Sequence, residues 1–446
     1  MSVKERPQRT MKSALASLAS SNILRQAGWL AAAKIVQGAA SIVATMVVGR
    51  HLGPAAFGLL SLASAIALFV GTTASLGLEQ IATRELAAFR PGWRPPLLPV
   101  LQRMRGFGAV AGCIILLASS AIPASREYRI SGLLAILCLL PLAQIGDLSE
   151  WRLIAAGRGR VVAIATALSS PIAAIARVAC AIAGAGLVVF AWLLVSEWAL
   201  RSLLLHLSLR ERGMPAPEAE TAFIESARRL LRDSMPLLLG GIAVFVYMRI
   251  DQFMIAAMLS PREVGLYSAV VTLAEVPLVL PVLLLRAALP VLSRQSETDK
   301  DKRDRTLVVL MRHTFYLHVG GAAFATIFAA PLVELLYGSA YAPAAQVLRI
   351  QAWGAPFVAL GVISGAWIVL QPDTRYALWR TLLGAAINIA LNLVLIPRFG
   401  IRGAACATVF AFAVTAFASD AFFPATRPLF RMKLRALGVP PPGPTA

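Results

Sequence analysis

The stretch LGPAAFGLLS at residues 52–61 recurs as LSPREVGLYS at residues 259–268, 207 positions further along the chain. Leu, Pro, Gly, Leu and Ser stand at the same offsets in both copies. Each copy follows one long apolar segment and begins another. A chain that repeats itself over half its length, within apolar segments, is typical of a duplicated membrane bundle. In transporters, such repeats enclose the substrate path between them.

The composition excludes an ordinary soluble domain. Of the 446 residues, 58% are hydrophobic and 14% are charged, with a mean hydropathy of +0.73, whereas soluble domains carry about 25% charged residues. The formal net charge is +20. The basic residues fall in short clusters between apolar segments, which is typical of cytoplasmic loops and not of nucleic-acid binding. We therefore expect contact with membrane lipids and no nucleic-acid partner.

The apolar segments predict an all-α integral membrane protein, because only helices satisfy their backbone hydrogen bonds when they cross lipid one by one. About twelve transmembrane helices are expected, in two pseudo-symmetric six-helix lobes around a central cavity. The expected spans are 27–48, 57–79, 106–123, 131–149, 160–182, 186–208, 234–258, 264–292, 313–335, 344–370, 376–397 and 401–423.

The loop charges predict the orientation. With twelve spans, the two termini and every second loop lie on one side of the membrane. These segments contain 31 of the 42 Lys and Arg residues, and the loops on the other side contain six. Basic residues collect on the cytoplasmic side, so both termini are expected there. Six spans in each half give both repeats the same orientation, related by an axis along the membrane normal.

Five segments follow from this division. We expect a cytoplasmic tail at 1–26, a first lobe at 27–209, a connector at 210–233, a second lobe at 234–424 and a cytoplasmic tail at 425–446. The later part of the connector has helical apolar spacing with several arginines, which predicts an amphipathic helix on the inner membrane surface. The final VPPPGPTA is expected to be disordered.

Ionisable residues within apolar spans are candidate functional residues, because burying them in lipid is costly. At about 1.5 Å per residue, Lys34 lies roughly 10 Å from the cytoplasmic side. Arg177, Arg249 and Arg349 fall in the outer third. These four are the candidate cavity cations.

Acidic candidates lie deeper. Glu197 and Glu275 fall near the midplane, and Asp251 lies two residues after Arg249. Arg201, one turn after Glu197, could neutralise it as an i,i+4 pair, so a cavity role and local pairing both remain open for Glu197. Arg249 and Asp251 are roughly 200° apart around their helix and cannot pair face to face, so each needs a different partner.

Two further pairs are spaced by one helical turn. Asn388 and Asn392 share a helix face, where they either line a polar path or hydrogen-bond between helices. Pro277 and Pro281 interrupt one span, because proline removes a helical hydrogen bond. They predict a hinge or an adaptation to packing.

No metal, cofactor or catalytic site is expected. The four cysteines form no CxxC pair and lie within apolar segments, the four histidines are scattered, and no GxxxxGK[ST] loop is present. The loops expected outside are too short and too poor in carboxylates for a membrane glycosyltransferase. The sequence therefore predicts no enzyme.

Four stretches carry a resemblance to a known family: VVGRHLGPAAFGLLSLA (47–63), YMRIDQFMIAAMLSPREVGLYSAVVTLAE (247–275), LLYGSAYAPAAQVLRI (335–350) and INIALNLVLIPRFGIRGAACAT (387–408). In order and spacing they resemble the polysaccharide (O-antigen type) flippases of the multidrug/oligosaccharidyl-lipid/polysaccharide exporter superfamily. The resemblance implies export of an undecaprenyl-pyrophosphate-linked oligosaccharide across the bacterial inner membrane by alternating access. It also implies a polysaccharide polymerase and glycosyltransferases as partners.

A pyrophosphate needs cations within the bilayer, and the four candidate cations are the available ones. Arg249 and Asp251 match the family motif R-x-D, whereas Lys34 and Arg177 are assigned by depth alone. Lys34 and Arg249 differ in depth by roughly 12 Å, so they could hold the pyrophosphate in turn. Two alternatives stay open: a cation-coupled drug or metabolite antiporter, which needs a buried carboxylate, and a non-transporting scaffold for envelope assembly.

Overall fold

The computed structural model describes residues 22–87, 97–122, 130–209, 220–369 and 375–439. Helices make up the described chain, and no strand occurs within it. The first half contains α2 (Asn22–Ala74), α3 (Leu78–Ala87), α4 (Leu97–Ala121), α6 (Ser131–Leu137), α7 (Leu140–Ala143), η1 (Gln144–Gly146), α8 (Asp147–Ala155), α9 (Gly159–Ile182) and α10 (Leu187–Leu207).

The second half begins with α11 (Glu220–Met258). It continues with α12 (Pro261–Glu275), η2 (Val276–Leu278), α13 (Val279–Thr298), α14 (Lys300–Ile327), α15 (Ala329–Tyr337), η3 (Ser339–Tyr341), α16 (Ala344–Gln351), α17 (Gly354–Val369), α18 (Arg375–Phe399), α19 (Ile401–Ala413), the π-helical turn η4 (Val414–Ala418), α20 (Ser419–Phe422), η5 (Pro424–Thr426) and α21 (Arg427–Ala436).

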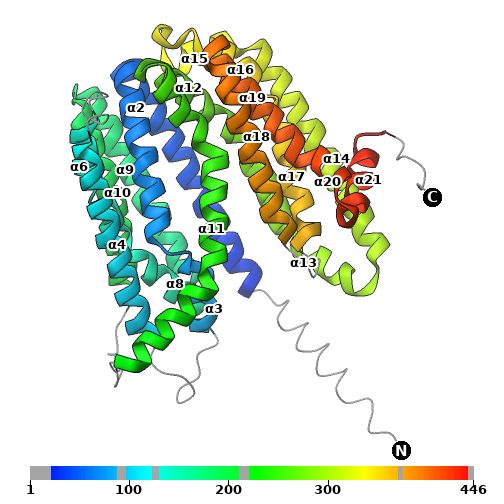
Figure 1. Cartoon of the computed structure of the whole chain (residues 1–446), viewed down its shortest axis with the longest axis horizontal. Helices are drawn as coiled ribbons and strands as arrows, with labels where there is room; N and C mark the ends of the chain where they lie inside the picture. The colour runs from blue at the N-terminus through cyan, green and yellow to red at the C-terminus, as the bar shows by residue number, and fades with distance from the viewer. Residues whose placement is uncertain (1–21, 88–96, 123–129, 210–219, 370–374, 440–446) are drawn as a thin grey trace, which may run out of the picture.

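The long helix α2 is two membrane crossings. A straight helix of its 53 residues would be about 80 Å long, far more than the roughly 30 Å core of a bilayer. Gly53 has φ 71° and ψ 168°, a left-handed conformation that glycine adopts without steric cost. Gln37 and Leu68 line the same cavity, so the chain turns back at Gly53 and forms a hairpin (Figure 1).

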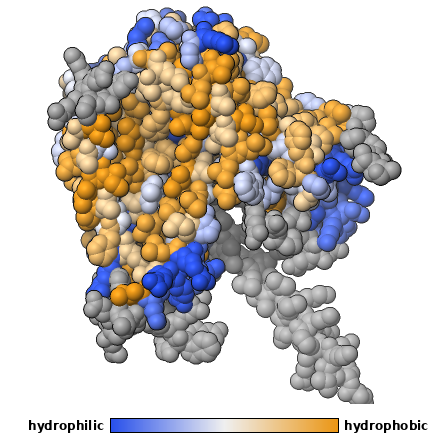
Figure 2. All heavy atoms as spheres, viewed as in Figure 1, coloured by the Kyte–Doolittle hydropathy of each residue, from blue (hydrophilic) through white to orange (hydrophobic). Residues whose placement is uncertain are grey.

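With this hairpin counted as two, the crossings agree with the expected twelve. Ten helices of the described residues are long and apolar enough to span a membrane. The bent pair of α14 and α15, which meet at 75°, is an eleventh candidate when counted as one span. Hydrophobic side chains cover the middle of the visible face, and hydrophilic ones gather near its two ends (Figure 2). The predicted all-α membrane fold is confirmed.

The two sequence repeats pack against each other. A Cβ atom added to Gly58 would collide with the backbone of Pro261 and Gly265, and one added to Gly265 would collide with the backbone of Pro54 and Gly58. Each contact is the other's counterpart at an offset of 207 residues, which is the reciprocity expected across a two-fold axis. The repeats therefore meet at one end of the molecule, here called the repeat end, as the sequence predicts.

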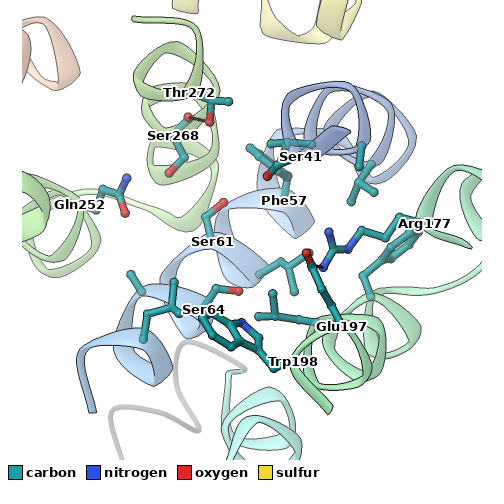
Figure 3. A pocket seen from close by; sticks show the side chains of 18 of the residues that line it. Ser41, Phe57, Ser61, Ser64, Arg177, Glu197, Trp198, Gln252, Ser268 and Thr272 are labelled. Carbon is teal, nitrogen blue, oxygen red and sulfur yellow. Dashed lines mark hydrogen bonds and ion pairs between the residues drawn. The ribbon is translucent and has the colours of Figure 1, made fainter. Parts of the chain in front are cut away.

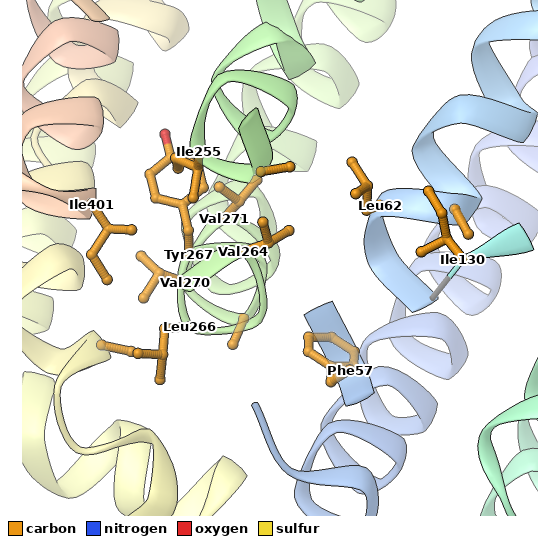
Figure 4. Packing of buried hydrophobic residues seen from close by; sticks show 14 of the residues in the cluster. Phe57, Leu62, Ile130, Ile255, Val264, Leu266, Tyr267, Val270, Val271 and Ile401 are labelled. Atoms are coloured by element: carbon orange, nitrogen blue, oxygen red, sulfur yellow. The ribbon is translucent and has the colours of Figure 1, made fainter. Parts of the chain in front are cut away.

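This crossing lies in the main hydrophobic core. Phe57 of α2 and Val264 of α12 occupy equivalent positions in the two repeats, and both are buried. Figure 4 shows them near one another, with Leu266 and Val270 on the side of α12 that faces Ile401 of α19. The first-half helices α2, α4, α9 and α10 lie on one side of Figure 1, and α14, α17, α18 and α19 lie on the other.

The predicted surface helix in the connector is not a separate element. Residues 210–219 lie outside the described residues, and from Glu220 the chain forms one helix with the first crossing of the second half. Leu230 of this extension is buried against Leu78 and Leu98 of the first half. Its apolar face is thus covered by protein rather than by lipid.

Part of the expected C-terminal tail is helical and packs on the second half. Residues 427–436 form α21, whose Leu429, Met432 and Ala436 are buried against α14 and α17. Lys433 of α21 forms a fully buried ion pair with Asp420. The predicted disorder falls almost wholly on residues 440–446, which lie outside the described residues.

Candidate functional site

A cavity of about 390 Å³ lies between the two halves, here called the central cavity. Its walls come from α2, α9 and α10 of the first half and from α11 and α12 of the second. Figure 3 shows these helices around the opening, with several polar side chains directed into it. The uncharged polar residues that line it are Gln37, Ser41, Thr45, Ser61, Ser64, Gln252, Ser268 and Thr272.

The lining follows the internal symmetry. Thr45 and Gln252 are 207 residues apart, and so are Ser61 and Ser268. Since the two repeats have the same offset, the cavity lies on the axis that relates them. Residues from equivalent positions therefore face the same space, which is where transporters with internal repeats bind their substrates.

Three arginines line the central cavity: Arg177 on α9, Arg201 on α10 and Arg249 on α11. They come from both halves. Arg177 and Arg249 are candidates that the sequence predicts. Arg201 was considered only as a partner of Glu197, because it lies near the end of its expected span.

Each of these arginines is paired with a carboxylate on another helix. The Arg177 guanidinium lies 2.5 Å from Glu197 Oε2, and Ser170 Oγ donates to the other oxygen at 2.9 Å; Figure 3 shows Arg177 and Glu197 side by side. Arg249 lies 3.1 Å from Glu275. The positive and negative charges at the central cavity therefore nearly cancel when no substrate is bound.

Arg201 does not pair with Glu197, the partner that its sequence spacing suggests. It lies 2.5 Å from Glu150 and 3.9 Å from Asp147, and its guanidinium stacks 5.6 Å from the Trp198 ring centre. The i,i+4 pair of Glu197 with Arg201 is thus absent, because Glu197 turns to Arg177. A further arginine, Arg105, is fully buried and donates to Ala74 O at 3.3 Å and Gln144 O at 3.2 Å.

Two of the four candidate cations lie outside the cavity lining. Lys34 is exposed and donates to Gln37 Oε1 at 3.0 Å; Gln37 lines the cavity, whereas Lys34 does not. Arg349 is exposed on α16, and its backbone carbonyl accepts from Thr326 at 3.4 Å. Depth alone selected these residues, and depth does not fix which way a helix face points.

Asp251 belongs to a buried hydrogen-bond network. It accepts from the hydroxyl of Tyr267, from Thr408 Oγ1 at 3.3 Å and from the Gln252 amide at 2.8 Å. As predicted, Arg249 and Asp251 have different partners.

The two asparagines continue the same network. Asn388 of α18 donates to Thr408 of α19 at 3.2 Å, and Asn392 donates to Asn388 at 2.9 Å. Both side chains are buried. Of the two alternatives, the structure has the hydrogen bond between helices.

Pro277 lies in a break of the helix, and Pro281 lies in the first turn of the helix that follows. Pro277 lies in the 3₁₀ turn η2 between α12 and α13, and its carbonyl accepts from His318 Nε2 at 3.1 Å. Proline cannot donate the helical hydrogen bond, which accounts for the break. A hinge role for this segment stays a prediction.

The chemistry of the cavity is that of a binding site. In the described residues, no group of three or more His, Cys, Asp or Glu side chains is placed to hold a metal ion. Guanidinium groups bind phosphate oxygens in a bidentate manner, and hydroxyl and amide groups match sugar hydroxyls. The site suits a molecule with a compact anionic group and polar extensions.

Comparison with known proteins agrees with this arrangement. A family model described as polysaccharide biosynthesis protein matches residues 23–296, which is more than half of the chain. The chain belongs to this family. The resemblance to polysaccharide flippases of the multidrug/oligosaccharidyl-lipid/polysaccharide exporter superfamily is thereby confirmed. A second model, MatE, matches residues 236–394.

One curated relative is a probable low-salt glycan biosynthesis flippase, Agl15, from Haloferax volcanii. It is 25% identical over 191 residues, which is 43% of this chain and 40% of that relative. The match thus spans less than half of the relative's length.

Solved structures share the fold. The lipid II flippase MurJ, in an inward closed conformation, superposes with a TM-score of 0.68 at 14% identity, over 90% of this chain and 91% of that one. A multidrug resistance MATE family transporter in an inward-facing conformation gives 0.71 at 15% identity, over 90% and 95%.

Sequence reasoning missed most of the polar lining. Gln37, Ser41 and Thr45 are spaced by four residues, and so are Ser268 and Thr272. Spacing of this kind places small polar groups on one helix face. Within otherwise apolar spans, it is the signal that would have indicated the cavity.

Proposed function

We propose that this protein is a flippase that moves an undecaprenyl-pyrophosphate-linked oligosaccharide from the inner to the outer leaflet of the bacterial cytoplasmic membrane. The family membership supports a transporter of polysaccharide precursors. The observation that carries the proposal is the set of three arginines, from both halves, that line one cavity between membrane helices.

The substrate class follows from the charges. A pyrophosphate loses most of its hydration inside a bilayer and needs fixed cations there. Arg177 and Arg249 line the cavity from opposite halves, so both face the space in which a pyrophosphate would lie. Serine, threonine and glutamine side chains on the same walls offer hydrogen bonds to sugars.

Alternating access is supported by the contacts at the repeat end. Besides the Gly58–Gly265 crossing, Tyr341 donates its hydroxyl to the Gly49 carbonyl at 2.8 Å, and Arg50 donates to the Leu335 carbonyl at 3.2 Å. These contacts join the two halves at that end. With the proposed orientation, in which both termini are cytoplasmic, the repeat end is periplasmic and the cavity is closed towards the outside.

Deletion of the gene tests the substrate. We expect a lipid-linked oligosaccharide to accumulate on the cytoplasmic face, and its chemical analysis identifies the sugar. A plasmid-borne wild-type copy should clear it, whereas a copy carrying Arg177→Ala and Arg249→Ala at equal abundance should not. Normal surface polysaccharide in the deletion strain, without any accumulated precursor, contradicts the proposal.

The MatE match over residues 236–394 favours a second candidate, a cation-coupled drug or metabolite antiporter. The buried carboxylate of Asp251 is the kind of group that such coupling needs. Increased sensitivity of the deletion strain to cationic drugs, with surface polysaccharide unchanged, would favour it. A non-transporting scaffold for envelope assembly, the remaining candidate, would keep its function when the cavity arginines are neutralised.

A further inference from the structure

We infer that Glu197 and Glu275 act as built-in competitors of the substrate: each holds a cavity arginine while the cavity is empty and gives it up to a phosphate oxygen when substrate binds. The inference rests on the proposed function and assigns these two residues a positioning role in it. They set how tightly the anion is held and how readily it leaves.

The pairing is the first observation. Arg177 and Arg249 are the two predicted cations that line the central cavity, and each guanidinium already contacts a glutamate. The Arg177–Glu197 pair is nearly enclosed, with side chains 13% and 17% exposed. The Arg249–Glu275 pair is more accessible, at 32% and 34%. A phosphate can therefore reach Arg249 with less rearrangement than Arg177.

The second observation concerns the charges that an exchange leaves behind. A guanidinium without an anionic partner is costly within a bilayer, and so is an isolated carboxylate. When phosphate replaces the glutamate, the arginine keeps an anionic partner throughout. Glu197 also keeps a hydrogen bond from Ser170 Oγ, at 2.9 Å in the empty site. In binding, the arginine exchanges its glutamate for a phosphate, and in release it exchanges the phosphate for the glutamate. The arginine is never left without an anionic partner.

The third observation is where the partners lie. Arg177 and Glu197 come from α9 and α10 of the first half, and Arg249 and Glu275 come from α11 and α12 of the second. Movement of one half against the other leaves both pairs intact but changes the distance between the two arginines. A pyrophosphate that bridges them is thus held firmly in one arrangement only. After the halves move apart, each glutamate can reclaim its arginine and expel the phosphate.

Equilibrium binding of a soluble probe tests the inference. The full-length protein in nanodiscs is titrated with farnesyl pyrophosphate, and binding is followed by calorimetry. We expect Glu197→Gln and Glu275→Gln each to tighten binding by about tenfold, because a charged competitor for the guanidinium is removed. Translocation at saturating substrate should slow in the same variants, because release becomes harder. A merely structural role predicts weaker binding instead.

Glu334→Gln serves as the matched control, because Glu334 is exposed on α15 and does not line the cavity. It should bind the probe like the wild type. If either glutamine variant fails to fold, the Glu→Asp variant at the same position replaces it. The shorter side chain keeps the charge but weakens the ion pair with arginine. This variant should therefore bind the probe with an affinity between those expected for the wild type and for the Glu→Gln variant. Unchanged or weaker binding in well-folded Glu197 and Glu275 variants overturns the inference.

Variants of the two arginines distinguish a failure of the competitor role from a failure of the proposed function. If Arg177→Gln and Arg249→Gln lose the probe while the glutamate variants bind like the wild type, the proposed function stands and the competitor role is wrong. If the arginine variants also bind the probe like the wild type, the cavity does not recognise pyrophosphate, and both proposals fail.

Discussion

Substitution of Arg249 distinguishes a role in substrate binding from a purely structural role. It lines the cavity and lies 3.1 Å from Glu275. If its charge holds the substrate, Arg249→Lys should keep part of the export and Arg249→Ala should lose most of it. Surface polysaccharide is measured per folded transporter in the membrane.

If Arg249 only stabilises its helix pair, Arg249→Ala lowers the amount of folded protein, and the remaining molecules export normally. Unchanged export per molecule would thus remove the binding role. Lys34→Ala is the informative comparison, because Lys34 does not line the cavity. We expect it to have a smaller effect than Arg249→Ala.

At this scale, the sequence identified the charged residues at the cavity better than it identified their partners. Arg177, Arg249, Glu197 and Glu275 were found because charges are rare in apolar spans. Their pairing depends on how each helix is rotated about its axis, which spacing within a single helix does not determine. For the same reason Lys34 and Arg349, which were expected in the cavity, do not line it in this structure.

Among the elements, the crossing of α2 and α12 depends on two glycines. Gly58→Ala or Gly265→Ala places a methyl group against facing backbone, which cannot move aside as a side chain can. We expect each to destabilise the protein by about 1–3 kcal/mol, seen as a lower unfolding temperature in detergent. Gly38→Ala, on the same helix but with open space around it, should be neutral or stabilising. Equal unfolding temperatures for Gly58→Ala and Gly38→Ala would contradict the crossing.

The helix α21 is held by the buried ion pair of Lys433 with Asp420. Burial lowers the pKa of Lys433 to about 8, although the Asp420 carboxylate acts in the opposite direction. Lys433→Met leaves Asp420 buried without a cation and should cost about 3–5 kcal/mol. Adding Asp420→Asn removes the stranded charge, so the double variant should unfold at a higher temperature than Lys433→Met alone. A double variant that is less stable than the single one contradicts this account.

The sequence did not determine the surroundings of two elements, for one physical reason. The first turns of α11 were expected to form a helix on the membrane surface, and no packed helix was expected at residues 427–436 of the tail. An amphipathic helix on a membrane and one packed on protein show the same periodicity. Only the tertiary contacts, such as Leu230 with Leu78, distinguish them.

At the scale of the whole molecule, the sequence predicts the orientation and the structure adds a constraint. Pro54 lies at the repeat crossing, and Gly338 lies next to Arg50 at the same end. In a background without the four native cysteines, single cysteines at positions 54 and 338 should react with an impermeant reagent from outside. A cysteine at position 302 should not. Outside labelling at position 302 contradicts the twelve-span orientation.

The fold was predictable because the sequence repeats and the apolar spans indicate it with little further reasoning. The apolar segments and the loop charges predict twelve crossings with an even number in each half, and the spacing of LGPAAFGLLS and LSPREVGLYS predicts a shared repeat end. The division of α2 at Gly53 was also foreseen, since two spans were expected there. A central cavity was expected as well, but most of its polar lining was not, because that lining forms only where the polar faces of α2, α9, α10, α11 and α12 meet.

The central claim is that arginines of both halves carry a lipid pyrophosphate through the cavity. Its most direct test is translocation in proteoliposomes, using an undecaprenyl-pyrophosphate-linked oligosaccharide with a fluorescent sugar and an impermeant quencher outside. The wild-type protein should expose the inner-leaflet substrate over time, and the Arg177→Gln/Arg249→Gln double variant should be as slow as protein-free vesicles. Translocation at the wild-type rate by a correctly folded double variant would contradict the account.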